Sequence, residues 1–300
     1  MDLRIINFPD KVFKEYLVAN FDKDNDGEIS LTEALSIKAI DCPQKGIKSI
    51  AGIEFFSNLE SLNCSKNEIE RIDVSHNRQL KYLQCSDNFS LSELDVQNNL
   101  LLTFLYCRAC NLQHLDCSQN KELKHLSCGF NPIREINLFH NTKIEYLNVR
   151  RCGLEELELR HLKNLEALDC SENKIQELRL YECKKLTRLD CSCNDLINDL
   201  YVGGNMSLKS LDCRKNKNLA SITVSEGQYI ENIQSGIKPM TSEYRQYQEF
   251  KAYQKEKDYE EYSASYEDEQ AYYEGWSRED VDSGLADAYE NDLDAIWNND

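Results

Sequence analysis

The chain has fewer basic than acidic residues and therefore little positive charge with which to bind a polyanion. Its 300 residues hold 35 lysines and arginines against 53 aspartates and glutamates, for a net charge of −18. Residues 241–300 alone hold 18 acidic and 5 basic residues, a net of −13, which leaves −5 for the first 240. Because binding to phosphates requires a basic surface, we expect no nucleic-acid partner.

Long apolar runs are also missing. No stretch reaches the roughly 20 apolar residues that cross a bilayer, so we expect no membrane span. The first residues, MDLRIINFPDK, lack the basic start and sustained apolar run of a signal peptide. We therefore expect a cytoplasmic protein, or an extracellular or cell-surface one if this N-terminus is truncated.

Motifs of the common enzyme classes are absent as well. The sequence holds no Gly-rich phosphate loop, no G-x-S-x-G and no H-E-x-x-H. The five histidines are scattered through the chain, at positions 76, 114, 125, 140 and 161. We therefore expect a protein that is not an enzyme.

What the chain does contain is a repeat from Leu59 to Val224. Its half-motif reads L-x-x-L-x-[C/V/L]-x-x-N, and its apolar end residue recurs in two interleaved series with a period of 21 or 22 residues. The first series ends at Cys64, Cys85, Cys107, Cys128, Val149, Cys170, Cys191 and Cys213, and the second at Val74, Val96, Cys117, Leu138, Leu159, Leu180, Val202 and Val224. Apolar residues alternate with polar ones within each half-motif, as in a short strand with one buried face. One coil cannot bury that face alone, so the coils must stack.

This pattern resembles the leucine-rich repeat, and its doubled form resembles the bacterial nested class called IRREKO. The resemblance implies a repeat solenoid of mostly short parallel β-strands. Because both halves of each coil look strand-like, we expect two roughly parallel sheets back to back, with little arc. The expected division is an EF-hand-like cap over residues 1–46, the solenoid over 47–240 and an acidic, Tyr-rich tail over 241–300.

Asparagine and cysteine fall in register with the repeat. The position three residues after the strand-end residue holds Asn in eleven of sixteen half-motifs and Cys in three, at Cys110, Cys152 and Cys183. A stacked Asn can satisfy turning backbone groups, which predicts an asparagine ladder, although Asn is also an ordinary turn residue. Of the thirteen cysteines, only Cys42 and Cys193 fall outside these rows. We expect all thirteen to be free thiols, since rows of stacked residues do not aim pairs at disulfide geometry.

A twelve-residue acidic stretch, Asp22-Lys-Asp-Asn-Asp-Gly-Glu-Ile-Ser-Leu-Thr-Glu33, is similar to the EF-hand calcium loop. The resemblance implies Ca²⁺ ligands at Asp22, Asp24, Asp26, Glu28 through its carbonyl, Ser30 through a water, and Glu33. A solvated acidic turn is the alternative. Flanking helices are expected over residues 10–21, with Asp10 as the cap, and over 32–40. A single EF-hand argues for a structural role, in which the helix pair shields the first coil.

The tail after residue 240 has its own pattern. Tyr244, Tyr247, Phe250 and Tyr253 recur every three residues, residues 258–275 look disordered, and a last amphipathic helix is expected from Val281 to Trp297. That helix either caps the last coil or docks to another protein.

Outward positions of the first-series strands carry aromatic and arginine side chains in the N-terminal half. Successive coils bring them into one patch, because neighbouring strands lie about 4.8 Å apart. The expected partner-binding residues are Tyr82, Phe104, Tyr106, Arg108, His125, Tyr146 and Arg150. Aromatics and Arg dominate binding energy when buried, but the same rings could simply pair as cross-strand neighbours.

Three hypotheses follow for function. The first is a monomeric scaffold that binds a protein or peptide and carries a structural calcium site. The second is a structural or assembly element whose acidic tail is the docking peptide. The third is a calcium-regulated switch. The repeat cannot name the ligand, because fold does not imply function.

Overall fold

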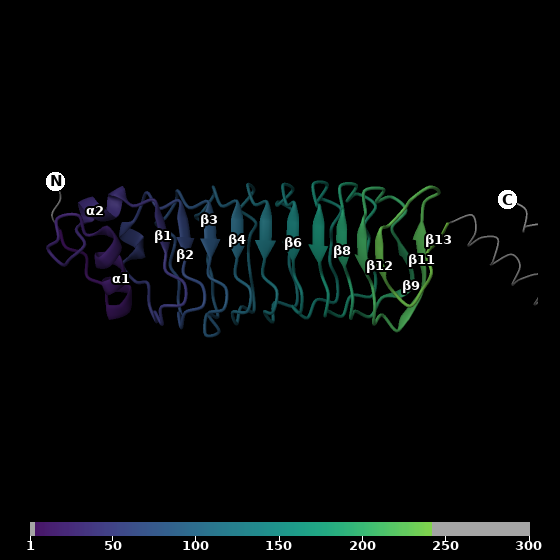
Figure 1. Cartoon of the computed structure of the whole chain (residues 1–300), viewed down its shortest axis with the longest axis horizontal. Helices are drawn as coiled ribbons and strands as arrows, with labels where there is room; N and C mark the ends of the chain where they lie inside the picture. Colours follow the sequence, from purple (N-terminus) through teal and green to yellow (C-terminus); the bar gives the residue numbers. More distant parts are fainter. Residues whose placement is uncertain (1–3, 242–300) are drawn as a thin grey trace, which may run out of the picture. The chain divides into compact units, whose positions relative to one another are not determined.

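The structure, a computed structural model, describes residues 4–241, and a parallel sheet of ten strands dominates it (Figure 1). The strands pair in the order β1-β2-β3-β4-β5-β6-β7-β8-β10-β12, one per coil. Their bounds are Ala39–Asp41 (β1), Ser61–Asn63 (β2), Tyr82–Gln84 (β3), Phe104–Tyr106 (β4), His125–Ser127 (β5), Tyr146–Asn148 (β6), Ala167–Asp169 (β7), Arg188–Asp190 (β8), Ser210–Asp212 (β10) and Asn232–Gln234 (β12). The expected repeat solenoid is confirmed, and its row of strands is nearly straight (Figure 1).

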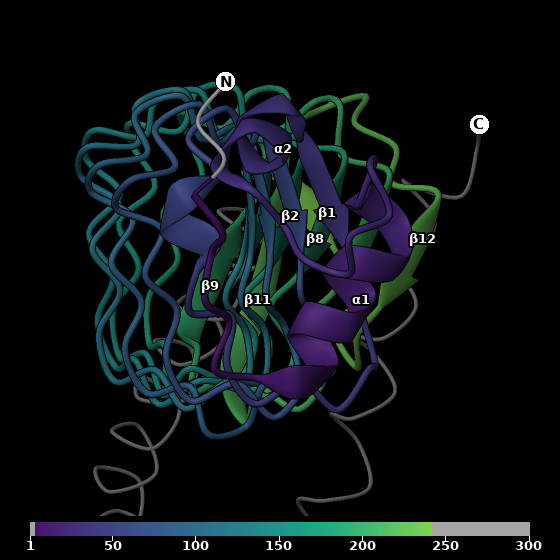
Figure 2. The ribbon, with the colours of Figure 1, turned by 90° about the vertical axis from the view of Figure 1, so that its left-hand side faces the viewer.

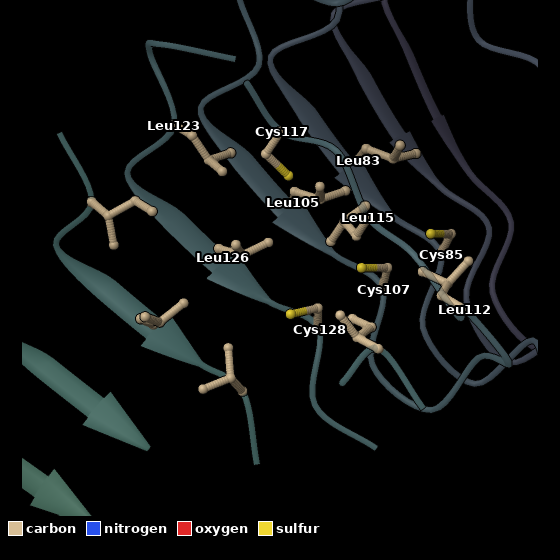
Figure 3. Packing of buried hydrophobic residues seen from close by; sticks show 14 of the residues in the cluster. Leu83, Cys85, Leu105, Cys107, Leu112, Leu115, Cys117, Leu123, Leu126 and Cys128 are labelled. Carbon is tan, nitrogen blue, oxygen red and sulfur yellow. The ribbon is translucent and has the colours of Figure 1, made fainter. Parts of the chain in front are cut away.

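The core is built from the central leucine of strands β2 to β8 and β10 and from the residue that follows each of these strands. Leu83 stands opposite Leu105 in the ladder, and both are fully buried. Cys85, Cys107 and Cys128 form a row at the ends of β3, β4 and β5, across from residues of the second series (Figure 3). A thiol is small and apolar enough to let neighbouring coils approach.

All thirteen cysteines are free thiols, as predicted, and twelve of them are buried. The prediction that Cys42 falls outside the rows was wrong. Ile40 pairs with Leu62 across β1 and β2, which gives Cys42 the place that Cys64 has in the next coil. The sequence from Ile37 to Cys42 is a half-motif with Ile in place of Leu.

The thirteenth thiol, that of Cys193, is partly exposed because it lies in a column of turns. One residue in the turn after each strand from β1 to β8 adopts a left-handed backbone, including Lys66 (φ 56°), Ala109 (φ 50°) and Cys193 (φ 55°). That conformation costs about 1–2 kcal/mol for a residue with a Cβ. This left-handed conformation is stabilised because the N–H of each such residue donates to a backbone carbonyl of the next coil, as from Lys66 to Ser86 at 2.8 Å. Cys193 therefore belongs to the outer turns, where its thiol is partly exposed.

The second series corrects the expectation of two full sheets. Within residues 4–241 it forms a sheet only near the end, from β9 (Ile197–Tyr201), β11 (Asn218–Val224) and β13 (Met240–Thr241), together with one isolated bridge between Asp73 and Asp95. Elsewhere its backbone groups close local turns. Asn77 N–H donates to the carbonyl of Val74, and Leu80 N–H donates to that of Asn77, both at 3.0 Å. These N–H groups therefore cannot pair with a neighbouring strand.

The predicted asparagine ladder is present in both series. In the first, Asn88 Nδ2 donates to the carbonyls of Cys64 (3.1 Å) and Cys85 (2.8 Å), and its Oδ1 accepts from Ile69 N–H (3.0 Å). In the second series Nδ2 again bridges two carbonyls, but the buried Oδ1 atoms find no partner among the described residues: Asn77, Asn99, Asn120, Asn141 and Asn205. The two asparagine columns therefore differ in how many of their side-chain polar atoms have hydrogen-bond partners.

Two helices cover the N-terminal end of the stack (Figure 2). Helix α1 (Lys11–Phe21) confirms the first predicted helix, with Asp10 accepting from Phe13 N–H at 2.8 Å. Helix α2 (Leu31–Ser36) is shorter than the predicted 32–40, because residues 39–41 pair as β1 with the next coil. A 3₁₀ helix, η1 (Ile53–Phe55), follows in the first coil.

The cap and the first coil share one core. The ring of Phe8 lies 5.8 Å from that of Phe13 and 6.3 Å from that of Phe56. No helix in the described part of the chain is long and apolar enough to span a membrane. The predictions for Tyr244 to Trp297 lie outside the described residues.

Candidate functional site

Five of the seven predicted partner residues come together on the outer face of the ten-stranded sheet. In-register pairing places Tyr82 beside Phe104, Phe104 beside His125, and His125 beside Tyr146. Their ring centroids are 6.2, 4.8 and 5.8 Å apart. Tyr106 joins from the next outward position, 5.8 Å from Tyr82. We call these five residues the aromatic stripe.

The stripe is half-buried by its own members. Each of the five side chains has intermediate exposure, because the rings cover one another. Desolvation raises the pKa of both Tyr82 and Tyr106, and nearby ionisable groups add to it. The two phenols are therefore neutral near pH 7 and can donate a hydrogen bond. Chemically, the stripe offers apolar ring surface with a few polar tips, which suits an apolar or aromatic side chain of a partner.

Arg108 and Arg150 lie beyond the strand ends, on either side of a ring that the sequence reasoning missed. The Arg108 guanidinium carbon is 4.4 Å from the ring centroid of Phe130, and that of Arg150 is 5.4 Å away. Both arginines are also paired, Arg108 with Asp87 at 3.3 Å and Arg150 with Glu172. The missed signal was that Phe130 is the one aromatic residue at a turn position where the other described coils hold Gln, Lys, Asp, Ala, Arg, Glu or Cys. The two arginines thus belong to a separate cluster at the turn.

The predicted calcium loop brings three of its acidic residues together. Ligand oxygens of Asp22, Asp24 and Glu33 all lie within 4.8 Å of one another. Gly27 adopts φ +83°, the left-handed conformation that the sharp turn needs. Asp22 accepts from Asn25 N–H at 2.7 Å and from Gly27 N–H at 2.9 Å, which folds the loop around that carboxylate.

The other predicted ligands are placed differently. Asp26 accepts from Glu28 N–H at 2.8 Å, and the Glu28 carboxylate pairs with Lys14 at 2.7 Å. Ser30 is the N-cap of α2 and forms a capping box with Glu33. Ser30 therefore fixes the Glu33 carboxylate, whose second oxygen accepts from Lys23 N–H at 2.7 Å.

Protonation in the loop reflects these contacts. A hydrogen bond from Gly27 N–H lowers the pKa of Asp22. Desolvation, with the charges of Asp26 and Glu33, raises the pKa of Asp24. Burial opposes ionisation of Glu33, yet hydrogen bonds from Lys23 and Ser30 lower its pKa. Three close carboxylates of this kind suit a hard divalent cation, which prefers oxygen ligands.

Together these features define a leucine-rich repeat solenoid with a helical cap. Neither a protein-family model nor a curated protein matches the sequence. Among solved structures, internalin C2 of Listeria monocytogenes has the same fold, with a TM-score of 0.58 and 20% identity over 73% of this chain and 94% of that one.

Two further solved structures are similar at lower scores. The functional domain of InlJ from Listeria monocytogenes, described as including a cysteine ladder, is 22% identical over 78% of this chain and 73% of that chain, with a TM-score of 0.43. A leucine-rich repeat protein of Leptospira interrogans is 19% identical over 64% of each chain, with a TM-score of 0.47. The likeness to internalin C2, at 20% identity, shows the fold alone.

Proposed function

We propose that the chain is a non-enzymatic scaffold that binds a protein or peptide on the outer face of its ten-stranded sheet. The observation that carries this proposal is the aromatic stripe: five rings from four neighbouring coils in contact with one another. The strands beneath it are held by continuous ladders, so the rings are presented on a rigid surface and little ordering entropy is lost on binding.

The competing explanation is that the rings only stabilise the sheet. Cross-strand aromatic pairs contribute roughly 0.2–1 kcal/mol each. The row of rings, however, ends at β6, because the next outward residues in the same row are Ala167 and Arg188. These later strands pair in the same register without rings, so the fold does not require them.

A triple substitution separates the two explanations. Phe104→Ser, Tyr106→Ser and Tyr146→Ser together should abolish partner capture and change the melting temperature little. The matched control replaces three exposed aromatics elsewhere, Phe139, Tyr181 and Tyr229, by Ser. Loss of stability with capture intact would show that the stripe is structural.

The alternative function, a structural or assembly element whose acidic tail docks to a partner, is tested by the same capture assay. The full chain and a chain of residues 1–240 are compared for the partners they retain. Loss of every partner on removal of the tail would favour the docking-tail alternative over the sheet surface.

We also propose that the loop from Asp22 to Glu33 holds Ca²⁺ as a structural element of the cap. The convergence of the Asp22, Asp24 and Glu33 oxygens supports this proposal. Asp26, the Glu28 carbonyl and a water on Ser30 would complete the set, as in EF-hand loops. A bound cation would neutralise the repulsion among the carboxylates and tie α1 to α2.

Thermal melts with Ca²⁺, with Mg²⁺ and with EGTA test this site. Ca²⁺ at a hundredfold excess over its Kd should add about 2.7 kcal/mol to the unfolding free energy. Glu33→Gln should remove most of that gain while leaving the capping box, since Gln also serves there. Glu28→Gln is the matched control, because it removes the same charge from a side chain that pairs with Lys14. If the melting temperature does not change with Ca²⁺, with EGTA or on Glu33→Gln substitution, the loop is only an acidic turn.

A further inference from the structure

The row of third strand residues on the outer face becomes acidic beyond the aromatic stripe. Asn148 on β6 pairs in register with Asp169 on β7. Asp169 pairs in turn with Asp190 on β8, and Asp190 pairs with Asp212 on β10. Neighbouring strands lie about 4.8 Å apart, so the three carboxylates stand side by side, and like charges placed in this way destabilise a sheet. We call Asp169, Asp190 and Asp212 the carboxylate row.

The turns that follow these strands do not require the charge. Asp190 Oδ1 accepts from the backbone N–H of Ser192 at 3.0 Å and from its hydroxyl at 2.7 Å. After β2, the neutral amide oxygen of Asn63 accepts the same two hydrogen bonds from Ser65, at 3.1 and 2.8 Å. Asn148 likewise accepts from the N–H two residues ahead, at 3.1 Å. An uncharged side chain therefore serves at this position, and the fold does not explain the three carboxylates.

Arginine neutralises the carboxylate row at its far end only. Arg214 binds Asp212 through Nε at 3.0 Å and through Nη2 at 2.6 Å. Around the other two aspartates, the segments 166–171 and 187–192 hold three carboxylates and one cation, Arg188, for a net charge of −2. That negative end of the row is the end that adjoins the aromatic stripe.

The charges of Asp169 and Asp190 act as far as the edge of the stripe. The hydrogen bond to Glu172 raises the pKa of Arg150, and the charges of these two aspartates add to that rise. Arg150 follows β6, the last strand of the stripe, and its ion pair with Glu172 leaves the two aspartates available to another cation. Apolar rings and negative charge are therefore adjacent on one rigid face.

We propose that the outer face binds an extended peptide segment in which Arg or Lys lies about three residues from an aromatic or apolar side chain. This inference rests on the function proposed for the aromatic stripe and adds the chemistry of the partner. The aromatic side chain packs on the rings of β3 to β6, and the cation lies between Asp169 and Asp190. β6 and β8 are two strand spacings apart, about 10 Å, which an extended chain covers in about three residues. A guanidinium suits this place best, because its planar fork of donors can bridge two carboxylates.

Selection of a random dodecapeptide library, displayed on phage, against the native full chain tests the pairing of rings and charge. Sequences enriched on the unchanged chain should combine an aromatic or apolar residue with Arg or Lys about three positions away. On the Asp169→Asn, Asp190→Asn double variant, the enriched sequences should keep the aromatic residue and lose the cation. Asn removes the charge but keeps the turn bond, as Asn63 does, so the double variant should melt no lower than the unchanged chain.

The matched control is Asp73→Asn with Asp116→Asn. Both of these carboxylates accept the same kind of turn bond, at 3.0 and 2.8 Å, but they belong to the second series. For the most enriched peptide, fluorescence anisotropy at about 50 mM salt should show that the double variant loses affinity by about threefold to tenfold, while the control loses none. The loss should shrink at about 500 mM salt. Arg188→Gln should raise the affinity by about twofold to threefold, because it removes a like charge beside the bound cation.

The outcomes separate this inference from the proposed function. Enrichment of aromatic residues without Arg or Lys, or equal affinity of the peptide for the double variant and for the control, would overturn the cationic partner and leave the stripe as a binding surface. Peptides that bind the Phe104→Ser, Tyr106→Ser, Tyr146→Ser variant as well as the unchanged chain would overturn the stripe itself. A selection that enriches no sequence would overturn both.

Discussion

An alanine substitution should cost more stability in the first asparagine column than in the second, although both columns place a buried Asn at the same point of the repeat. Asn131 in the first column is 1% exposed and Asn120 in the second is 0% exposed. Asn131 Nδ2 donates to three carbonyls, at 2.8, 2.8 and 3.4 Å, and its Oδ1 accepts from Leu112 N–H at 3.0 Å. Asn120 Nδ2 donates to two carbonyls, both at 2.9 Å, while its Oδ1 has no partner among the described residues.

The expected costs follow from this difference. Asn131→Ala strands buried groups of both kinds, each worth about 1–3 kcal/mol and not fully additive, so we expect a loss of about 3–5 kcal/mol. Asn120→Ala strands carbonyls but also removes an unpaired buried oxygen, which offsets about 1–3 kcal/mol. We therefore expect it to cost about 2 kcal/mol less than Asn131→Ala.

Urea unfolding followed by circular dichroism measures both losses. The midpoint gives the stability change provided that the slope m is unchanged, and a change of m would signal that the stack no longer unfolds as one unit. An Asn120→Ala loss equal to or above that of Asn131→Ala would refute the reasoning, because it would mean that the second-column oxygens are satisfied in the folded chain.

Three shorter predictions follow from the cap and the thiols. Burial raises the pKa of Asp10, but backbone hydrogen bonds from Phe13, Lys48 and Ser49 bring this pKa below its ordinary value of 3.8. The ionised Asp10 carboxylate therefore stabilises the fold above pH 3.8, and this stabilisation is lost as the pH falls below the lowered pKa. Asp10→Ala should therefore lower the melting temperature at pH 7 and have little effect near pH 2. Titration with a thiol reagent in denaturant, without reductant, should count all thirteen thiols, whereas a count near one would indicate disulfides. Cys110→Asn should raise the unfolding free energy by about 1 kcal/mol through restored ladder bonds, and a loss of stability in urea would contradict that account.

The first-series strands could be predicted from the sequence because each of their residues has one consistent placement, either facing the core or facing outward. Leu105 must be inward for its coil to bury a face, and the 21- or 22-residue period then aligns it with Leu83 and Leu126. Alternation also fixed the outward placement of Phe104 and Tyr106. The aromatic stripe followed from these two facts and from the spacing between strands.

Strand content in the second series was not predictable from the same alternation. The half-motif specifies which residues face the core, and a turn can bury them as well as a strand can. Eleven residues separate the two series from Cys191 to Val202 and from Cys213 to Val224, where β9 and β11 form, but also from Cys85 to Val96, where Asp95 makes only an isolated bridge. Spacing alone therefore does not decide strand content. The segments of β9 and β11 hold Tyr201, Ile222 and Thr223, residue types that favour extended backbone.

Composition alone was misleading at the junction of cap and solenoid. Leu31 to Ile40 has helical spacing, but Ile37 and Ile40 are also the two apolar residues of a half-motif that ends at Cys42. Pairing of β1 with β2 satisfies backbone groups along three residues, whereas about one more helical turn would leave the first coil without a neighbour. The non-local pairing therefore prevails over local propensity.

The cluster of Arg108 and Arg150 around Phe130 shows why a site on a repeat is harder to predict than its fold. A period places every residue of a column in an equivalent environment, so Phe130 counts as one more turn residue in the sequence. What distinguishes Phe130 is the coil before it, which supplies Arg108, and the coil after it, which supplies Arg150. These neighbours lie about 20 residues away in sequence and become adjacent only through stacking. In a solenoid the site is therefore specified along the stacking axis, and candidate residues must be compared across coils as well as along the chain.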